Sequence, residues 1–122
     1  MKKRIIQINE ISIAVVNSEQ VIIKDSQSAL DFMSTISYYD KCDRIVINKQ
    51  AITEEFFKLS TGIAGEILQK FINYSKKIAI AGDFSVYPSK PLKDFIYECN
   101  RGNDIFFVAD EQTAINKLAN AL

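Results

Sequence analysis

A short segment from Ser60 to Glu66 combines two hydroxyl side chains with two glycines just before a periodic apolar stretch. Ser60 and Thr61 are therefore expected at the start of a helix. The first turn of a helix has backbone N–H groups without partners and the positive end of the helix dipole. Such a turn can bind a phosphate group or be modified by one. The alternative is that Ser60 and Thr61 only cap the helix, with Glu66 already complementing its dipole.

Gly62 and Gly65 lie three residues apart in the same expected helix. A glycine inside a helix costs about 1 kcal/mol relative to alanine, so each glycine needs a physical reason. The first interpretation is close packing of this helix against a neighbouring element. The second is close approach of a ligand or a second subunit.

Three aspartates stand at the ends of expected elements. Asp83 follows a buried strand, whereas Asp25 and Asp110 precede helices. If the three converge, they form an acidic cluster that can hold Mg²⁺, because this cation needs little beyond carboxylates and water. The simpler interpretation is that Asp25 and Asp110 are helix caps.

The loop after Asp83 carries Ser85, Tyr87 and Lys90. Polar and aromatic side chains at the end of a strand are a candidate binding rim. The alternative is a solvated surface loop. The charged residues around Glu54 and Glu55 are interpreted as a solvated helical face that includes Lys49 and Lys58.

The composition excludes several classes of chemistry. The chain has 122 residues, no histidine, and equal numbers of acidic and basic residues. We therefore expect no histidine-based catalysis, no ordinary zinc site, no cofactor, and no nucleic acid as the main partner. Cys42 and Cys99 are expected to be reduced, as in a cytoplasmic protein. No apolar run is long enough to predict a membrane span.

Apolar periodicity predicts a β-hairpin followed by alternating helices and strands. Such alternation is typical of a single α/β domain with a mainly parallel sheet, here covering residues 1–122. The strands are expected at 4–8, 11–16, 44–47, 77–81 and 104–108, with helices between and after them. The carboxyl ends of the parallel strands are then the expected place for ligands.

Residues with special backbone roles set the expected boundaries. Asn9 is expected in the hairpin turn, and Thr61, Ser89 and Asp110 are expected to cap helices. Gly102 is predicted to end a helix in the left-handed conformation. Leu122 is expected to face inward from the last helix. Whether the helical turn at 53–59 continues into the helix at 61–74 stays open.

The order of the strands bears on the oligomeric state. If the strands lie side by side in chain order, right-handed crossovers place the helices on one face of the sheet. The other face then needs a cover, and a homodimer is one way to provide it.

Several segments resemble the bacterial domain of unknown function 4180 family, and the match covers nearly the whole chain. They are Ile45–Ile47, Glu55–Phe57, Thr61–Phe71, Ala79–Phe84 and Asp94–Glu98. This resemblance implies no established activity. More distantly, the order of elements is similar to the SpoIIAA-like (STAS) fold, which includes anti-sigma-factor antagonists and small ligand-binding proteins.

The segment Ser60-Thr61-Gly62-Ile63 resembles the Asp-Ser-Ser-Gly-Leu segment of those antagonists, although Leu59 stands in place of the aspartate. In that class a partner kinase phosphorylates the first serine, so the resemblance implies Ser60 as the modified residue.

Two functions therefore compete. The first is a non-enzymatic regulatory or protein-interaction module whose surface combines residues 60–66 and 82–90 and whose partner is another protein or a second copy. The alternative is a small-ligand or phosphate-binding protein, or an enzyme that uses carboxylates and a metal at Asp83.

Overall fold

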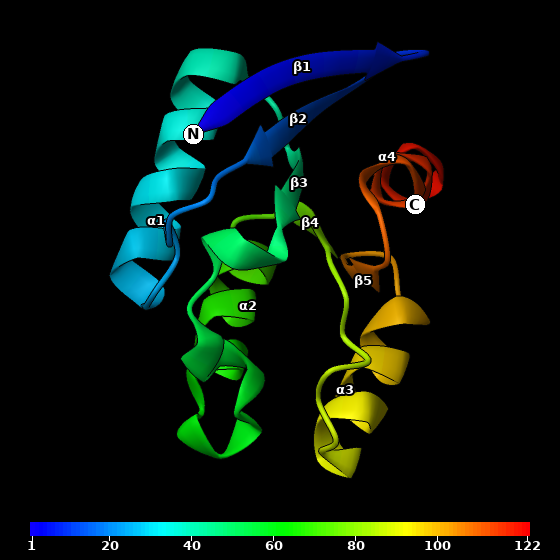
Figure 1. Ribbon diagram of the computed structural model, residues 1–122. Helices are drawn as coiled ribbons and strands as arrows, with labels where there is room; N and C mark the ends of the chain where they lie inside the picture. The colour runs from blue at the N-terminus through cyan, green and yellow to red at the C-terminus, as the bar shows by residue number, and fades with distance from the viewer.

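Five strands form one sheet in which neighbours in the sequence are also neighbours in space (Figure 1). The structure is a computed structural model that describes residues 1–122. The strands are β1 (Lys2–Ile8), β2 (Ile11–Asn17), β3 (Arg44–Asn48), β4 (Lys77–Ala81) and β5 (Ile105–Val108). β1 and β2 are antiparallel, and all other neighbours are parallel. The predicted α/β class and mainly parallel sheet are confirmed.

The hairpin turn between β1 and β2 occupies two residues, Asn9 and Glu10. Asn9 has φ 55°, a left-handed conformation that asparagine adopts more easily than most residues. The expected turn is therefore confirmed. Farther along, Ile23 makes an isolated parallel bridge with Ile52 rather than a full strand.

Four α-helices connect or follow the strands: α1 (Ser26–Thr35), α2 (Ile63–Asn73), α3 (Lys90–Asn100) and α4 (Glu111–Asn120). Asp25, Ser89 and Asp110 cap α1, α3 and α4 by accepting hydrogen bonds from backbone N–H groups of the first turn. These three predicted caps are confirmed. No helix of the chain combines the length and the apolar character needed to cross a membrane.

The start of α2 differs from the prediction. The capping position is held by Gly62 at φ 78°, not by Thr61, and three separate helical pieces precede α2. These pieces are η2 (Lys49–Ala51), η3 (Glu54–Phe57) and η4 (Leu59–Thr61). The left-handed residue at 62 turns the chain sharply, so the helical turn at 53–59 is not continuous with α2.

Two expectations near the ends of helices are wrong. Gly102 does not have a positive φ, because α3 ends in tightened turns with Arg101 N–H bonded to Glu98 O and Gly102 N–H bonded to Cys99 O. Leu122 is 96% exposed, because α4 ends at Asn120 and the last residues leave the helical path.

Helices cover both faces of the sheet. The larger core joins α1, α2 and α3 to one face, with Phe56, Phe71 and Leu92 among its buried side chains. The smaller core joins α4 to the other face through Ala114, Ile115 and Leu118. The strands do lie in chain order, the condition under which a homodimer was considered, but α4 lies on the second face and covers it, so no second copy is needed there.

Candidate functional site

The carboxyl ends of β3, β4 and β5, three of the four parallel strands, lie together at one edge of the sheet. The register pairs Asn48 with Ala81, and Ala81 with Val108. Gly82 continues this alignment, since its N–H donates to Val108 O at 2.9 Å. The segments that follow β3 and β4 therefore meet, as expected for the ligand-binding edge of a parallel sheet.

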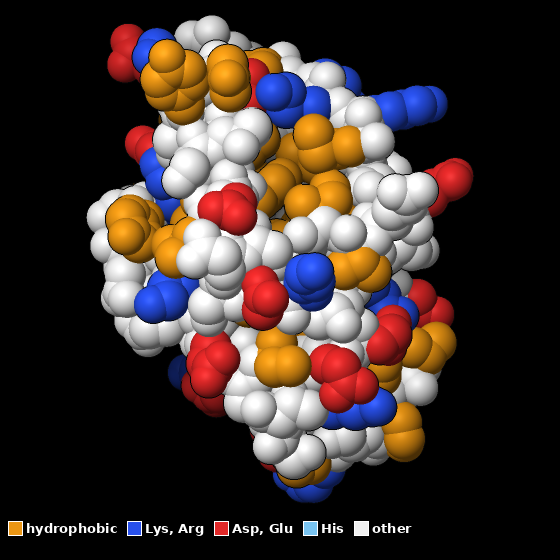
Figure 2. All heavy atoms as spheres, turned by 90° about the vertical axis from the view of Figure 1, so that its left-hand side faces the viewer, with side chains coloured by type: hydrophobic (Ala, Val, Ile, Leu, Met, Phe, Trp, Pro, Cys, Tyr) orange, Lys and Arg blue, Asp and Glu red, His pale blue; other side chains and the backbone are white.

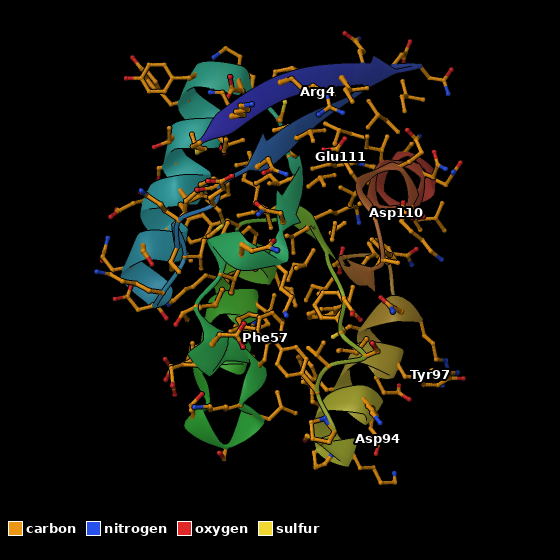
Figure 3. All side chains as sticks on the ribbon, viewed as in Figure 1. Arg4, Phe57, Asp94, Tyr97, Asp110 and Glu111 are labelled. Carbon is orange, nitrogen blue, oxygen red and sulfur yellow. The ribbon has the colours of Figure 1, made fainter.

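Four side chains pack together at this edge, and we call Lys49, Glu54, Phe57 and Tyr87 the edge cluster. The rings of Phe57 and Tyr87 stack with centroids 5.0 Å apart and an angle of 15° between their planes. Tyr87 donates its hydroxyl to Glu54, with Oε2 at 2.9 Å. Phe57 lies between α2 and the loop that leads into α3 (Figure 3).

Lys49 is the cation of the edge cluster. Its Nζ lies 4.7 Å from the centroid of the Tyr87 ring and 4.0 Å from Glu54 Oε1, and its side chain is 17% exposed. Burial, together with the hydrogen bond to Glu54, raises the pKa of Tyr87 well above its usual value. The prediction of a solvated face holds for Lys58 and Glu55 but is wrong for Lys49, whose stem is buried against aromatic rings.

Gly82 permits the close approach of β4 to Lys49. A Cβ atom added at Gly82 would lie 2.6 Å from Lys49 Cβ, closer than side chains tolerate. The two segments at the edge can therefore touch only because residue 82 has no side chain. Lys49 directly follows the buried strand β3, and this position is the signal in the sequence that could have identified it.

Asp83 is occupied within its own loop. Ser85 donates both its backbone N–H and its hydroxyl to Asp83 Oδ1, at 2.9 and 2.5 Å, and these bonds lower the pKa of Asp83. Asp25 and Asp110 serve as caps of helices on opposite faces of the sheet. The three aspartates do not converge, and no three Asp, Glu, Cys or His side chains lie close enough together to hold a metal ion.

Ser60 and Thr61 are both exposed but differ in their contacts. Thr61 Oγ1 lies 2.8 Å from Lys58 O and 3.0 Å from Glu55 O, and it accepts a hydrogen bond from Ile63 N–H at 3.2 Å. The Ser60 hydroxyl makes no hydrogen bond with the rest of the chain. Of the two predicted hydroxyls, only that of Ser60 is free.

Gly62 and Gly65 do not pack closely against a neighbouring element. No atom lies within 4 Å of a Cβ added at either glycine, and both residues are exposed. The predicted helix packing is therefore wrong. Glu66, in the same turn as Gly65, is also exposed and has no ion-pair partner.

The two predicted loops are joined through η3. Thr61 contacts Glu55, and Phe57 of the same η3 stacks on Tyr87, so both predicted loops contact this short helix. Lys90 is not part of the edge cluster. It pairs instead with Asp94 at 2.8 Å along α3, and its side chain is 83% exposed.

Neither cysteine belongs to a candidate functional site. Cys42 is buried, Cys99 is half-buried, and both thiols are free. Burial raises the pKa of both thiols, which disfavours the nucleophilic thiolate.

A hollow lies away from these residues, between α1 and the end of α2. It has a volume of about 520 Å³. Figure 2 shows the side of the molecule formed by α1, with hydrophobic side chains gathered in its upper half and charges of both signs around them. The hollow is lined by Gln27, Leu30, Asp31, Met33, Ser34, Ser37, Tyr74 and Lys76. Sequence periodicity missed it because Leu30 and Met33 read as ordinary core residues.

Comparisons with known proteins place the chain in a family. Searches of curated proteins and of solved structures found no match to it. The family model described as "Domain of unknown function (DUF4180)" matches residues 8–118, which include β2 to β5, α1 to α3 and all but the last two residues of α4. The chain therefore belongs to the DUF4180 family.

Proposed function

We propose that this chain is a non-enzymatic regulatory module of the bacterial cytoplasm that binds another protein through one surface. This surface consists of the exposed parts of residues 54–66 and 82–87. The observation that carries the proposal is Gly65, an exposed glycine in the first turn of α2 with open space around its missing side chain. Because nothing inside the chain requires glycine there, a second molecule that approaches the backbone closely is the physical reason that remains.

The free hydroxyl of Ser60 gives this surface a means of regulation. A phosphate on Ser60 would add nearly two negative charges to this exposed surface, five residues before Gly65 and six before Glu66. Repulsion would weaken the binding of an acidic partner, and attraction would strengthen the binding of a basic one. The chain-order sheet is consistent with the SpoIIAA-like (STAS) fold that the sequence resembles, in which the corresponding serine is phosphorylated.

The test is affinity capture of three versions of the protein from its own cells. The wild type should recover the partner, and Gly65→Ala should recover less of it, because the added methyl group enters the space that the partner's close approach requires. Gly65→Trp should recover at least about tenfold less, equivalent to about 1.4 kcal/mol of binding. Circular dichroism checks that all three are folded, and mass analysis should find phosphate on Ser60.

A partner that binds Gly65→Trp as well as the wild type would place the interface elsewhere and contradict the proposal. Phosphate confined to other residues would remove the switch at Ser60 but not the surface.

A second candidate function uses the same edge of the sheet. Lys49 is a largely buried cation that directly follows the carboxyl end of β3, which favours binding of a small anionic ligand. A thermal-shift series with inorganic phosphate, nucleotides and Mg²⁺ tests this function, since a ligand that binds only the folded state raises the melting temperature. A shift that Lys49→Met abolishes would support the ligand-binding alternative.

A further inference from the structure

The two outer edges of the sheet are treated differently. At the β5 edge, the side chain of Asn100 accepts from Phe107 N–H at 2.7 Å and donates to Phe107 O at 3.1 Å. This amide occupies the place that a neighbouring strand would take. At the other edge, β1 has no hydrogen bond to its backbone apart from those with β2. Figure 1 shows β1 as the outermost strand, with nothing drawn along its far side.

The open edge of β1 presents a defined set of backbone groups. Ile8 and Ile11 close the two-residue hairpin turn and are therefore a hydrogen-bonded pair. Because such pairs alternate along antiparallel strands, Ile6 and Arg4 also face β2. The N–H and C=O groups of Lys3, Ile5 and Gln7 consequently point outward without partners.

We propose that this edge binds β1 of a second copy of the chain in antiparallel orientation, with the two-fold axis at Ile5. In this register Ile5 lies opposite its own equivalent, and Lys3 lies opposite Gln7. These residues are the ones whose backbone groups point outward, so each pair can exchange both of its hydrogen bonds. The result is one continuous sheet through both copies. This inference does not depend on the function proposed above, which concerns a different surface.

The charges along β1 fit this register. Lys2 lies opposite Ile8, Lys3 opposite Gln7, and Arg4 opposite Ile6, so no cation faces another directly across the pair. Moving the axis by one residue, to Arg4, would place two arginines opposite each other, which is unfavourable. The register at Ile5 therefore avoids like-charge pairs and uses the whole strand.

Two of the three basic residues of β1, Lys3 and Arg4, are already paired with acidic side chains of their own chain, which favours a second copy over an acidic peptide. Lys3 Nζ lies 2.7 Å from Asp40 Oδ2, and Arg4 Nη2 lies 2.6 Å from Glu111 Oε2 at the start of α4 (Figure 3). An acidic segment would gain little attraction from cations that are already paired. A second copy has zero formal net charge and also buries Ile5, whose side chain is 45% exposed.

Cross-linking tests the register directly. In a Cys99→Ser background, Ile5→Cys places two thiols on residues whose Cα atoms are about 5.5 Å apart, within disulfide reach. Gln7→Cys is the matched control, since its Cα would lie more than about 13 Å from its own equivalent. We expect mild oxidation to give a covalent dimer with Ile5→Cys and none with Gln7→Cys.

Sedimentation equilibrium tests the association without a cross-link. The mass of the wild type should rise towards twice that of the monomer with increasing concentration. Ile5→Lys places two ammonium groups at the axis and should remain monomeric, with circular dichroism confirming its fold.

Three results would overturn the proposal. If the wild type stays monomeric up to about 1 mM, the edge of β1 does not bind a second copy of the chain. A dimer that survives Ile5→Lys uses another surface. Equal cross-linking of the two cysteine variants indicates random collision instead of a fixed register.

Discussion

Gly62 and Gly65 stand three residues apart but are glycines for different physical reasons. Gly62 has φ 78°, a conformation in which a side chain is strained whatever space surrounds it. Gly65 has an ordinary helical conformation and open space beside it. The spacing of the two residues in the sequence suggested one shared packing role, and the backbone angles separate them.

Alanine substitutions at the two glycines should therefore have opposite effects. Gly65→Ala should stabilise the protein by about 0.5–1 kcal/mol, because alanine loses less backbone entropy in a helix. Gly62→Ala should destabilise it by about 1–2 kcal/mol, the cost of a left-handed conformation with a side chain. Urea unfolding of both variants measures the difference. Effects of the same sign would contradict the backbone assignment at the start of α2.

Helix starts were the elements that sequence reasoning located best. Asp25, Ser89 and Asp110 were predicted as caps and are caps, because a short polar side chain before an apolar periodic stretch has one favourable local role. Thr61 has the same local signature but lies inside a succession of tight turns. There its hydroxyl contacts the carbonyl oxygens of the preceding turn, and Gly62 takes the cap position.

The cap of α4 should make stability depend on pH. The bond from Thr113 N–H lowers the pKa of Asp110 in the folded state. Its stabilisation is therefore fully present above the unfolded pKa of about 3.9 and is lost as pH falls through the folded pKa. Asp110→Asn keeps an acceptor but has no charge. The wild type should be more stable than this variant at pH 7, and the difference should shrink at acid pH, as the pH falls below about 3.9 and through the lower folded pKa.

Urea unfolding at both pH values measures this difference. If the wild type and Asp110→Asn differ in free energy of unfolding by the same amount at acid and neutral pH, the charge of Asp110 does not stabilise the start of α4.

At the scale of the whole molecule, α4 decides whether the chain can exist as a folded monomer. Three helices pack on one face of the sheet, and α4 alone covers the other. Its buried residues Ala114, Ile115 and Leu118 close a core that includes Val46 and Phe106. Association through β1, as proposed above, would extend the sheet across two monomers. It would not be needed to cover an apolar face of the sheet, because α4 already does so.

Truncation of Leu118 should test the contribution of this second core. Leu118 is fully buried, so Leu118→Ala should lower the free energy of unfolding by about 2–5 kcal/mol through lost transfer energy and a cavity. Lys117→Ala, at an exposed neighbouring position, should change it by less than about 0.5 kcal/mol. Equal effects of the two substitutions in urea unfolding would contradict the proposed role of α4 as the cover.

The candidate site was only partly accessible from the sequence. Residues 60–66 and 82–90 were identified because hydroxyls, glycines and strand ends leave local signals. The sequence did not reveal that Phe57 and Tyr87 connect these two segments. Their rings stack although the residues are 30 positions apart, and local patterns identify Phe57 only as a core residue and Tyr87 only as a loop residue. Lys49 was placed on a solvated face because its charge, and not its aromatic neighbours, is visible in the sequence.

The sequence by itself determined the α/β class, the chain positions of all five strands and three of the four helix caps. These features depend on periodicity and on contacts between residues close in the chain, which local patterns record. Only the tertiary structure decided that α4 covers the second face, that the three aspartates stay apart, and that Gly65 has no packing partner. Each of these depends on where the chain returns after a crossover, and that path is set by long-range packing of the sheet rather than by any neighbouring residues.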